Sequence, residues 1–201
     1  MKLILSSSSP RRQEIMDMFD IEYIVDTTDV ERTLVLTSTP HINAMVSAFM
    51  KAASVYEKNI DEEDDIVVLG ADTTVTIGDY QFGKPKDDDD QFSMLKYLSG
   101  KTHDVITGYA IIKKDYKYVD YVVSKVKFKE LSEETIKNYI KTEEGGDKAG
   151  SYALQGIGSI FIDSINGDYQ NIIGLPISKI YDVLKTKFSL DLLDFEKFEN
   201  Q

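Results

Sequence analysis

Extended apolar runs and helical patterns alternate along this chain, and this alternation is the feature that most constrains its fold. Runs rich in β-branched residues predict strands, and apolar residues that recur every three or four positions predict helices. Strands are expected at residues 3–6 and 21–25, and over 66–77 as a strand broken at Gly70 and a second extended run. A pair of strands is expected around a turn near Asp115 within 103–129, and a hairpin at Asn166-Gly167 within 159–173. Helices are expected to start at Pro10 and Pro40 and to cover residues 87–98, 132–141 and 176–188. We therefore expect an α/β fold with a mixed sheet, organised as two lobes with a cleft between them.

Two of the helical patterns predict which side chains enter the core. Behind Pro10, the apolar residues on one helical face are Ile15, Met18 and Phe19. Behind Pro40, the residues that follow the helical period are Ile42, Met45, Val46, Phe49, Ala52, Ala53 and Tyr56.

Composition and charge exclude several classes of protein. The 201 residues include 42% hydrophobic ones, enough for a proper core, and no cysteine, which excludes disulfides and thiolate zinc sites. The apolar run near the N-terminus lasts three residues, and no run approaches about 18, so we expect no signal peptide, no membrane-spanning helix and a cytoplasmic protein. The net charge of −12 argues against a nucleic-acid partner. We expect one domain over residues 1–188, followed by an acidic tail over 189–201.

The stretch "SSSSPRR" at residues 6–12 follows the first expected strand and opens the first expected helix. A helix N-terminus presents unpaired N–H groups and a partial positive charge, and serine hydroxyls and arginine forks add further donors. This combination favours an anion site that suits phosphate. An ordinary N-cap followed by two exposed arginines is the alternative.

Three further positions carry groups that could act on an anion. Asp72, in "GADTT", follows an apolar strand, where it could hold a divalent cation, take a proton from water, or bond to local amides. Lys84 lies in the rigid turn "GKP", pointing either inward or to solvent. Lys51 lies within a helix beside apolar residues, where it either extends to the surface or faces a charge.

The glycine-rich stretch "GGDKAGSYALQGIG" at residues 145–158 suits a loop that wraps around a ligand, or a flexible loop without one. Its Gln155 amide could read the edge of a nucleobase. The two histidines, His41 and His103, are interpreted as structural residues. The sequence offers no Ser-His-Asp set, no GxGxxG motif and no Walker A motif.

In their order, "LSSSSPRR", "GADT", "GKP", "LSGKTHDVITG", "DKAGSYALQG" and "INGDYQNIIGLP" resemble the Maf family of nucleoside triphosphate pyrophosphatases from Leu3 to about Leu184. The resemblance implies an elongated fold with a curved mixed sheet, flanking helices and a deep cleft, and a homodimer such as members often form. It implies cleavage of a nucleoside triphosphate between the α- and β-phosphates, with magnesium or manganese as the cofactor.

The resemblance also implies roles for individual residues. Asp72 would be the catalytic carboxylate, acting as proton acceptor or metal ligand, and Lys51, Lys84 and Arg12 would be the catalytic cations. The phosphate-binding positions would be Ser7, Ser9 and Arg12, and Glu31 would match a second metal-binding carboxylate. The base-selecting positions would be Arg11, Thr73 and Gln155, a combination that resembles the subgroup acting on dTTP and UTP.

Two departures from the family pattern leave other functions open. Arg32 replaces an acid beside Glu31, and Gly145-Gly146 stands where the family usually has "EP" and one further residue. The alternatives are a pyrophosphatase for 7-methyl-GTP or of broad specificity, and a nucleotide-binding regulator of cell division that hydrolyses little.

Overall fold

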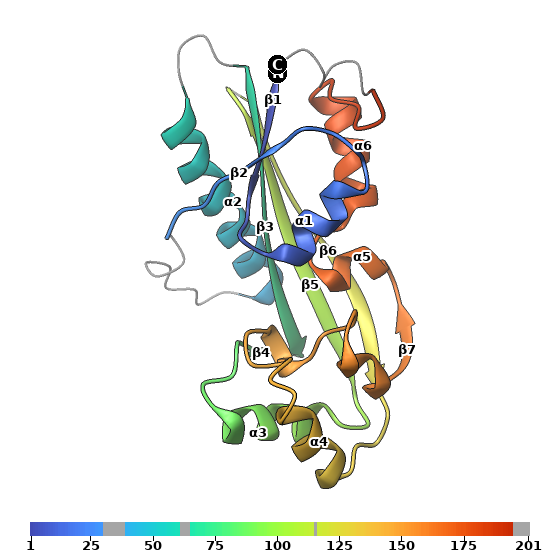
Figure 1. The fold of residues 1–201 in the computed structure, drawn as a ribbon. Coiled ribbons are helices and arrows are strands. Elements are labelled where there is room, and N and C mark those ends of the chain that lie inside the picture. Colours follow the sequence, from blue (N-terminus) through green and yellow to red (C-terminus); the bar gives the residue numbers. More distant parts are fainter. Residues whose placement is uncertain (30–38, 61–64, 115, 195–201) are drawn as a thin grey trace. The chain divides into compact units, whose positions relative to one another are not determined.

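The protein is an α/β structure built on one mixed sheet (Figure 1). The computed structural model describes residues 1–29, 39–60, 65–114 and 116–194. Its strands are β1 (Lys2–Ser6), β2 (Ile24–Val25), β3 (Ile66–Ile77), β4 (Tyr80–Phe82), β5 (Thr102–Lys113), β6 (Tyr116–Phe128) and β7 (Ile162–Asn166). Its helices are α1 (Pro10–Asp17), α2 (Pro40–Asn59), α3 (Asp88–Leu98), α4 (Glu133–Ile140), α5 (Tyr169–Ile173) and α6 (Ile177–Lys187), with 3₁₀ turns η2 (Ala149–Ser151) and η3 (Ile157–Phe161).

The strand order is β2-β1-β3-β5-β6-β7, and β4 pairs with β3 beside this path. Strand β1 runs parallel to both β2 and β3, whereas the pairs β3–β4 and β6–β7 are antiparallel. The expected α/β class and mixed sheet are therefore confirmed, while the cleft between two lobes stays a prediction. Among the described helices, none is long and apolar enough to cross a membrane.

The chain divides into two compact units that share the long strands. The first unit holds residues 1–72, 107–122 and 174–201, and the second holds residues 73–106 and 123–173. The expected domain over residues 1–188 stays a prediction. At the start of the expected tail, Leu190 and Leu192 are buried in the described part of the chain.

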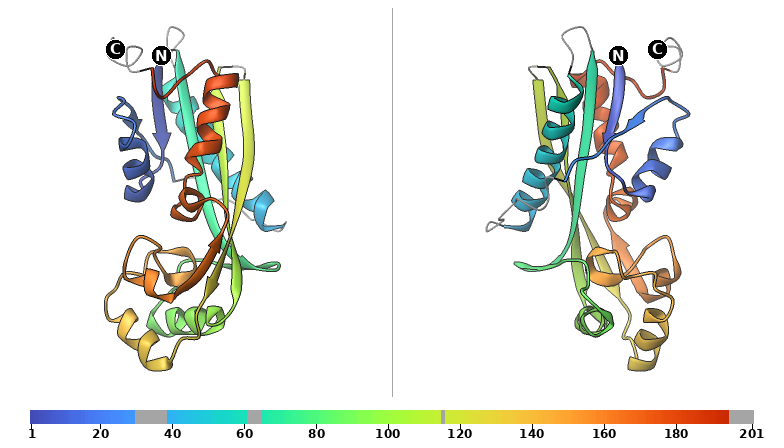
Figure 2. Two further views of the ribbon diagram at one scale, coloured as in Figure 1. Left: turned by 90° about the vertical axis from the view of Figure 1, so that its right-hand side faces the viewer. Right: turned by 60° about the vertical axis from the view of Figure 1, so that its left-hand side comes forward.

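In the first unit, α2 covers one face of the sheet, and α1 and α6 lie on the other face (Figures 1 and 2). Alternate residues of a strand point to opposite faces, so a strand covered on both sides must be apolar throughout. In β1, Ile4 packs in the cluster beneath α2, and its neighbours Leu3 and Leu5 are buried as well. This two-sided burial explains the short uninterrupted apolar run in the sequence.

The face of α2 that packs on the sheet differs in part from the expected one. Ala52 is buried as expected, and Phe49, Ala53 and Tyr56 pack, partly buried, against the same cluster. The buried side chains include Ala44, Ala48 and Ala52, whereas Ile42 and Val46 remain 39% and 37% exposed. The reason is close backbone packing on two glycines. A Cβ on Gly70 would lie 2.5 Å from the carbonyl oxygen of Ala48, and a Cβ on Gly108 would overlap the backbone of Ala44. Only small side chains fit between the helix and the sheet at these two points, and Ile42 and Val46 face outward.

Three other expectations, two near the N-terminus and one at Asn166-Gly167, need correction. Helix α1 ends at Asp17, and it buries Ile15 and Met16 rather than Met18, which is 62% exposed. Strand β2 covers only Ile24–Val25 of the expected run 21–25. Asn166-Gly167 does not join two strands, because β7 ends at Asn166 and the chain then enters α5. Asp168 favours this turn into a helix, since its Oδ1 accepts from the N–H groups of Gln170 and Asn171.

Helix starts marked by capping residues are confirmed. Asp87 caps α3 by accepting from the N–H of Asp90, and Ser132 caps α4 by accepting from the N–H of Thr135. Pro40 occupies the first turn of α2, as expected from the Thr39-Pro40 pair. Pro176 precedes the first residue of α6.

Strands β5 and β6 form the expected long pair, and Asp115 between them lies outside the described residues.

Candidate active site

The parallel pairing of β1 and β3 brings two predicted motifs together. In this register Ser6, the last residue of β1, lies opposite Gly70 of β3. The loop "SSSPRR" therefore leaves the sheet beside the "GADT" segment, although more than sixty residues separate the two in sequence. Ligands of open α/β sheets bind beyond the carboxyl ends of strands, and here β1 ends at Ser6. Strand β3 does not end there: it continues unbroken through Gly70 to Ile77, so Asp72 lies within this strand and not after it, as the sequence had indicated.

Ser7 organises the loop at the end of β1. Its buried hydroxyl oxygen accepts from the backbone N–H of Ser9 at 3.2 Å and from Nη1 of Arg12 at 3.1 Å. Arg12 also donates from Nε to the carbonyl oxygen of Gly174 at 2.7 Å. Ser9 occupies the N-cap position of α1, but its side chain makes no capping bond within the helix. The N-terminal turn of α1 and the Arg12 guanidinium thus come together, which is the arrangement that phosphate binding requires.

Lys51 and Asp72 form an ion pair beside this loop. Lys51 Nζ lies 2.7 Å from Asp72 Oδ1, and the two side chains are 12% and 28% exposed. The backbone of the Lys51 turn is fixed to β1, because Ser6 Oγ donates to the Lys51 carbonyl oxygen at 3.0 Å. Of the two expectations for Lys51, the structure confirms the one in which it faces a charge.

The expected metal ligands are only partly described. Glu31 and its neighbour Arg32 lie outside the described residues. Within the described ranges, no three Asp, Glu or His side chains are grouped closely enough to hold a metal. Asp72 nevertheless suits Mg²⁺ or Mn²⁺, because Lys51 holds one of its oxygens while its partly exposed carboxylate offers oxygen, the ligand these ions prefer. Magnesium commonly uses one or two carboxylates and completes its coordination with substrate phosphates and water.

In the second unit, the predicted lysine and the glycine-rich loop lie side by side. The carbonyl oxygen of Gly83, next to Lys84, accepts from the N–H of Gly150 at 3.2 Å. Gly150 has a φ of +71°, and its Cα packs so closely on Val75 that a Cβ would come within 3.1 Å of that side chain. Lys84 itself is exposed at this turn.

Glu144 fixes the two ends of the glycine-rich loop. Its carboxylate accepts from the N–H groups of Ile157 and Gly158 at 2.7 and 2.8 Å, and from the hydroxyl of Tyr139 at 2.8 Å. Burial favours a raised pKa for Glu144, but these hydrogen bonds outweigh it and lower the pKa. Gly145 fits tightly, since a Cβ there would overlap Ser151. The loop is therefore held at both ends, although the sequence departs from the family pattern at this point.

His103 and Tyr152 form a buried pair behind the same loop. His103 Nε2 and the Tyr152 hydroxyl are 2.8 Å apart, and His103 is 1% exposed. Burial lowers the pKa of His103 from 6.5 to about 4 and raises the pKa of Tyr152. His103 is thus a neutral core residue, in agreement with its interpretation as structural.

The predicted site residues fall into two sets, one in each unit. The first set comprises Ser7, Ser9, Arg11, Arg12, Lys51 and Asp72. The second set comprises Thr73, Lys84 and Gln155. Contacts within the first set join Arg12 to Ser7 and Lys51 to Asp72, and Gln155 is exposed near one end of the glycine-rich loop. That the two sets face one substrate stays a prediction.

Two groups that the sequence analysis missed are Glu144 and Gly174. The segment "GLP" stands at the end of a family motif, and its Gly-x-Pro spacing is the signal in the sequence for a special backbone conformation at Gly174. Nothing in the sequence connects Glu144 to the N–H groups of Ile157 and Gly158, because that bond depends on how the loop closes.

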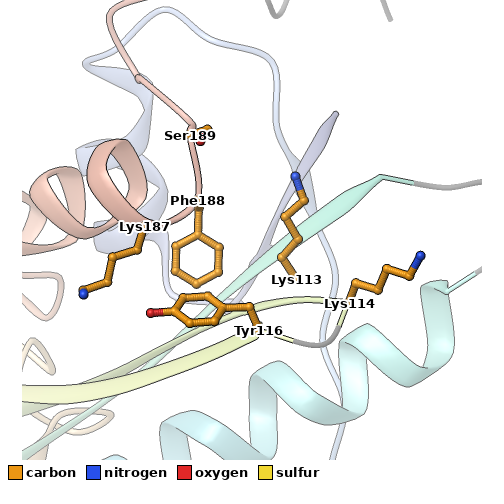
Figure 3. Close-up of a pocket in the computed structure, with 6 residues that line it drawn as sticks. All are labelled: Lys113, Lys114, Tyr116, Lys187, Phe188 and Ser189. Atoms are coloured by element: carbon orange, nitrogen blue, oxygen red, sulfur yellow. The ribbon is translucent and has the colours of Figure 1, made fainter.

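A surface cavity of about 510 Å³ lies in the first unit, lined by residues at the ends of β5, β6 and α6. Its aromatic floor is the pair Tyr116 and Phe188, with ring centroids 5.1 Å apart. Figure 3 shows the side chains of Lys113, Lys114 and Lys187 pointing in different directions around this pair. Lys113 is also engaged, with Nζ 2.9 Å from Asp65. The three ammonium groups do not converge on one point, so the cavity lacks the arrangement of an assembled polyanion site.

Comparisons with known proteins agree with the motifs. The sequence profile described as "Maf-like protein" matches residues 2–187. A dTTP/UTP pyrophosphatase of Clostridioides difficile (strain 630) is 44% identical over 194 residues, covering 96% of this chain and 98% of that protein. A dTTP/UTP pyrophosphatase of Thermoanaerobacter sp. (strain X514) is 46% identical over 197 residues, covering 96% of this chain and all of that protein. With the profile matching nearly its whole length, the chain belongs to the Maf family.

Proposed function

We propose that this protein is a nucleoside triphosphate pyrophosphatase that converts dTTP and UTP to the monophosphate and pyrophosphate. The observation that carries the proposal is the Lys51–Asp72 ion pair beside the Ser7–Arg12 cluster, where β1 ends next to the middle of the longer strand β3. The names of relatives that are 44% and 46% identical, dTTP/UTP pyrophosphatases, support the same reaction and substrates.

The chemistry follows from the charges at this place. The Arg12 guanidinium binds phosphate oxygens at the positive end of the α1 dipole, and Lys51 adds a second cation. Asp72 takes a proton from a water whose oxygen attacks the α-phosphorus. The bond from that phosphorus to the bridging oxygen breaks, and pyrophosphate leaves with the bond's electron pair. Lys51 holds the Asp72 carboxylate in one orientation throughout, because its ammonium group lies 2.7 Å away.

The proposed cofactor is Mg²⁺ or Mn²⁺, with Asp72 as the described protein ligand. When bound, the cation would neutralise charge on the triphosphate and polarise its phosphoryl oxygens. A local cation of this kind also explains how a protein with a net charge of −12 could hold a polyanionic substrate. Glu31 remains the second proposed ligand on the basis of the family resemblance.

We assign base selection to Arg11, Thr73 and Gln155. Gln155 is exposed, and the loop before and after it is fixed by Glu144, so an amide at this position could be presented in a constant orientation. We also propose a homodimer, as the family resemblance implies, and no nucleic-acid partner, because the chain carries 35 acidic and 23 basic residues.

The test is pyrophosphate release from dTTP, UTP, CTP, GTP, ATP and 7-methyl-GTP with magnesium or manganese. We expect turnover of dTTP and UTP, reduced at least about 100-fold in Asp72→Asn. Asp65→Asn is the matched control, since it also removes a short lysine–aspartate ion pair next to β3, with Lys113 instead of Lys51. Preferred turnover of 7-methyl-GTP would refute the base assignment. Binding of triphosphate without turnover would refute the enzymatic function and favour a nucleotide-binding regulator.

A further inference from the structure

Arg12 is held at two points by groups from distant parts of the sequence. Its Nε donates to the carbonyl oxygen of Gly174, 162 residues away, at 2.7 Å, and its Nη1 donates to Ser7 Oγ at 3.1 Å. Both nitrogens belong to one rigid planar group, so two such bonds fix its position and its plane. A lysine at this position could not reproduce this arrangement, because its ammonium is a point charge without a planar fork.

The direction of the Gly174 carbonyl group depends on a backbone conformation that glycine adopts easily. Gly174 joins α5 to α6 with a φ of +123°, a conformation that residues with a Cβ rarely adopt. The following residues fix the turn, since Leu175 is fully buried and its carbonyl oxygen accepts from the N–H of Ile177 at 2.7 Å. Pro176 restricts the backbone of Leu175 further. The carbonyl oxygen is therefore aimed by a local conformation that alanine would disturb.

We propose that Gly174 is a positioning residue that holds the Arg12 guanidinium in its phosphate-binding orientation. The inference rests on the proposed function, in which Arg12 binds the triphosphate. An arginine already held in one orientation loses less side-chain freedom on binding than a mobile one, and it meets the phosphate in a constant geometry. Gly174 thus acts on catalysis through Arg12 and without touching the substrate.

The first test is a double-mutant cycle on kcat/KM with Gly174→Ala, Arg12→Ala and the double variant. We expect Gly174→Ala to reduce kcat/KM by about 10- to 100-fold, as small misplacements of a binding group do. If Gly174 acts through Arg12, the double variant will be no slower than Arg12→Ala alone. Gly78→Ala is the control, because Gly78 also has a positive φ, +58°, yet has open space around its Cα. The proposal would be overturned if the double variant lost kcat/KM by the product of the two single losses. It would also be overturned if Gly174→Ala folded and kept the kcat/KM of the wild type.

The second test needs neither turnover nor a folded Gly174 variant. The chain has three arginines, so the Nε–H region of a ¹⁵N–¹H NMR spectrum is simple, and the signal lost in Arg12→Lys identifies Arg12. We expect the Arg12 Nε–H to exchange with water at least about 10-fold more slowly than that of Arg11, because a hydrogen bond protects it. Equal exchange rates would overturn the positioning role and leave the proposed reaction intact. Absence of turnover in the wild type would instead overturn the proposed function, whatever the exchange rate.

Discussion

The buried pair of His103 and Tyr152 predicts a specific dependence of stability on pH. His103 is 1% exposed, its Nε2 lies 2.8 Å from the Tyr152 hydroxyl, and its ring packs edge-on against Phe128 with centroids 4.8 Å apart. Burial lowers its pKa from 6.5 to about 4, although nearby Asp104 partly opposes the shift. The folded protein therefore keeps His103 neutral at pH values where the unfolded chain would protonate it.

The sign and size of the effect follow from proton linkage. Between pH 6.5 and about 4 the unfolded state binds one more proton than the folded state, so the free energy of unfolding falls as the pH falls. The contribution of His103 is fully present above pH 6.5. It decreases by about 1.4 kcal/mol per pH unit below that, which gives a loss of about 2 kcal/mol at pH 5.

The measurement is urea unfolding, followed by circular dichroism at pH 7, 6 and 5. The variant His103→Gln keeps a polar side chain that does not titrate, and His41→Gln changes the other histidine, which stacks on Tyr121. Between pH 7 and 5 we expect the wild type and His41→Gln to lose about 2 kcal/mol more than His103→Gln. Carboxylates that titrate in all three proteins cancel in this difference. Equal losses in the wild type and His103→Gln would refute the reasoning.

Two further predictions concern packing and the glycine-rich loop. Gly108→Ala places a methyl group on the backbone of Ala44, which cannot move aside as a side chain could, so we expect urea unfolding to show a loss of about 1–3 kcal/mol or more. Gly83→Ala, where the added methyl group meets open space and the φ is not positive, should stay within about 1 kcal/mol of the wild type by the same measurement. Glu144→Gln weakens the bonds to Ile157 and Gly158, and hydrogen exchange of these two amides should accelerate about 10-fold or more. Unchanged protection at both amides would show that Glu144 does not hold the loop.

Features of the fold that depend only on residues close together in the sequence were predicted well. The helix starts at Asp87 and Ser132 are local events, in which a side chain accepts from an N–H three residues later. Alternation of apolar runs and helices indicated the α/β class, because each element must bury its own apolar face. The same locality explains the error at Asn166-Gly167, where a turn sequence typical of hairpins leads instead into α5 under the influence of Asp168.

The part of the α2 face that lies on Gly70 and Gly108 could not be predicted from the sequence of the helix itself. Periodicity favours the larger apolar residues as the buried face, which is correct when a helix packs at an ordinary distance. Here Gly70 and Gly108 allow the helix backbone to approach the sheet, and the space that remains accepts only alanine and similarly small residues. Such an arrangement depends on which strand residues lie beneath the helix, and this is decided by the tertiary structure.

The sequence by itself determined the family, the order of the elements and the candidate residues, because motifs and caps are short stretches of neighbouring positions. Only the tertiary structure decided which of those residues touch. Parallel pairing of β1 with β3 carries Ser7 to the neighbourhood of Asp72, and close packing of α2 brings Lys51 within 2.7 Å of that carboxylate. The contact between Arg12 and Gly174 spans 162 residues, and it exists because the turn before α6 returns to the start of α1. A contact over such a separation depends on the path of the whole chain, which no local pattern contains.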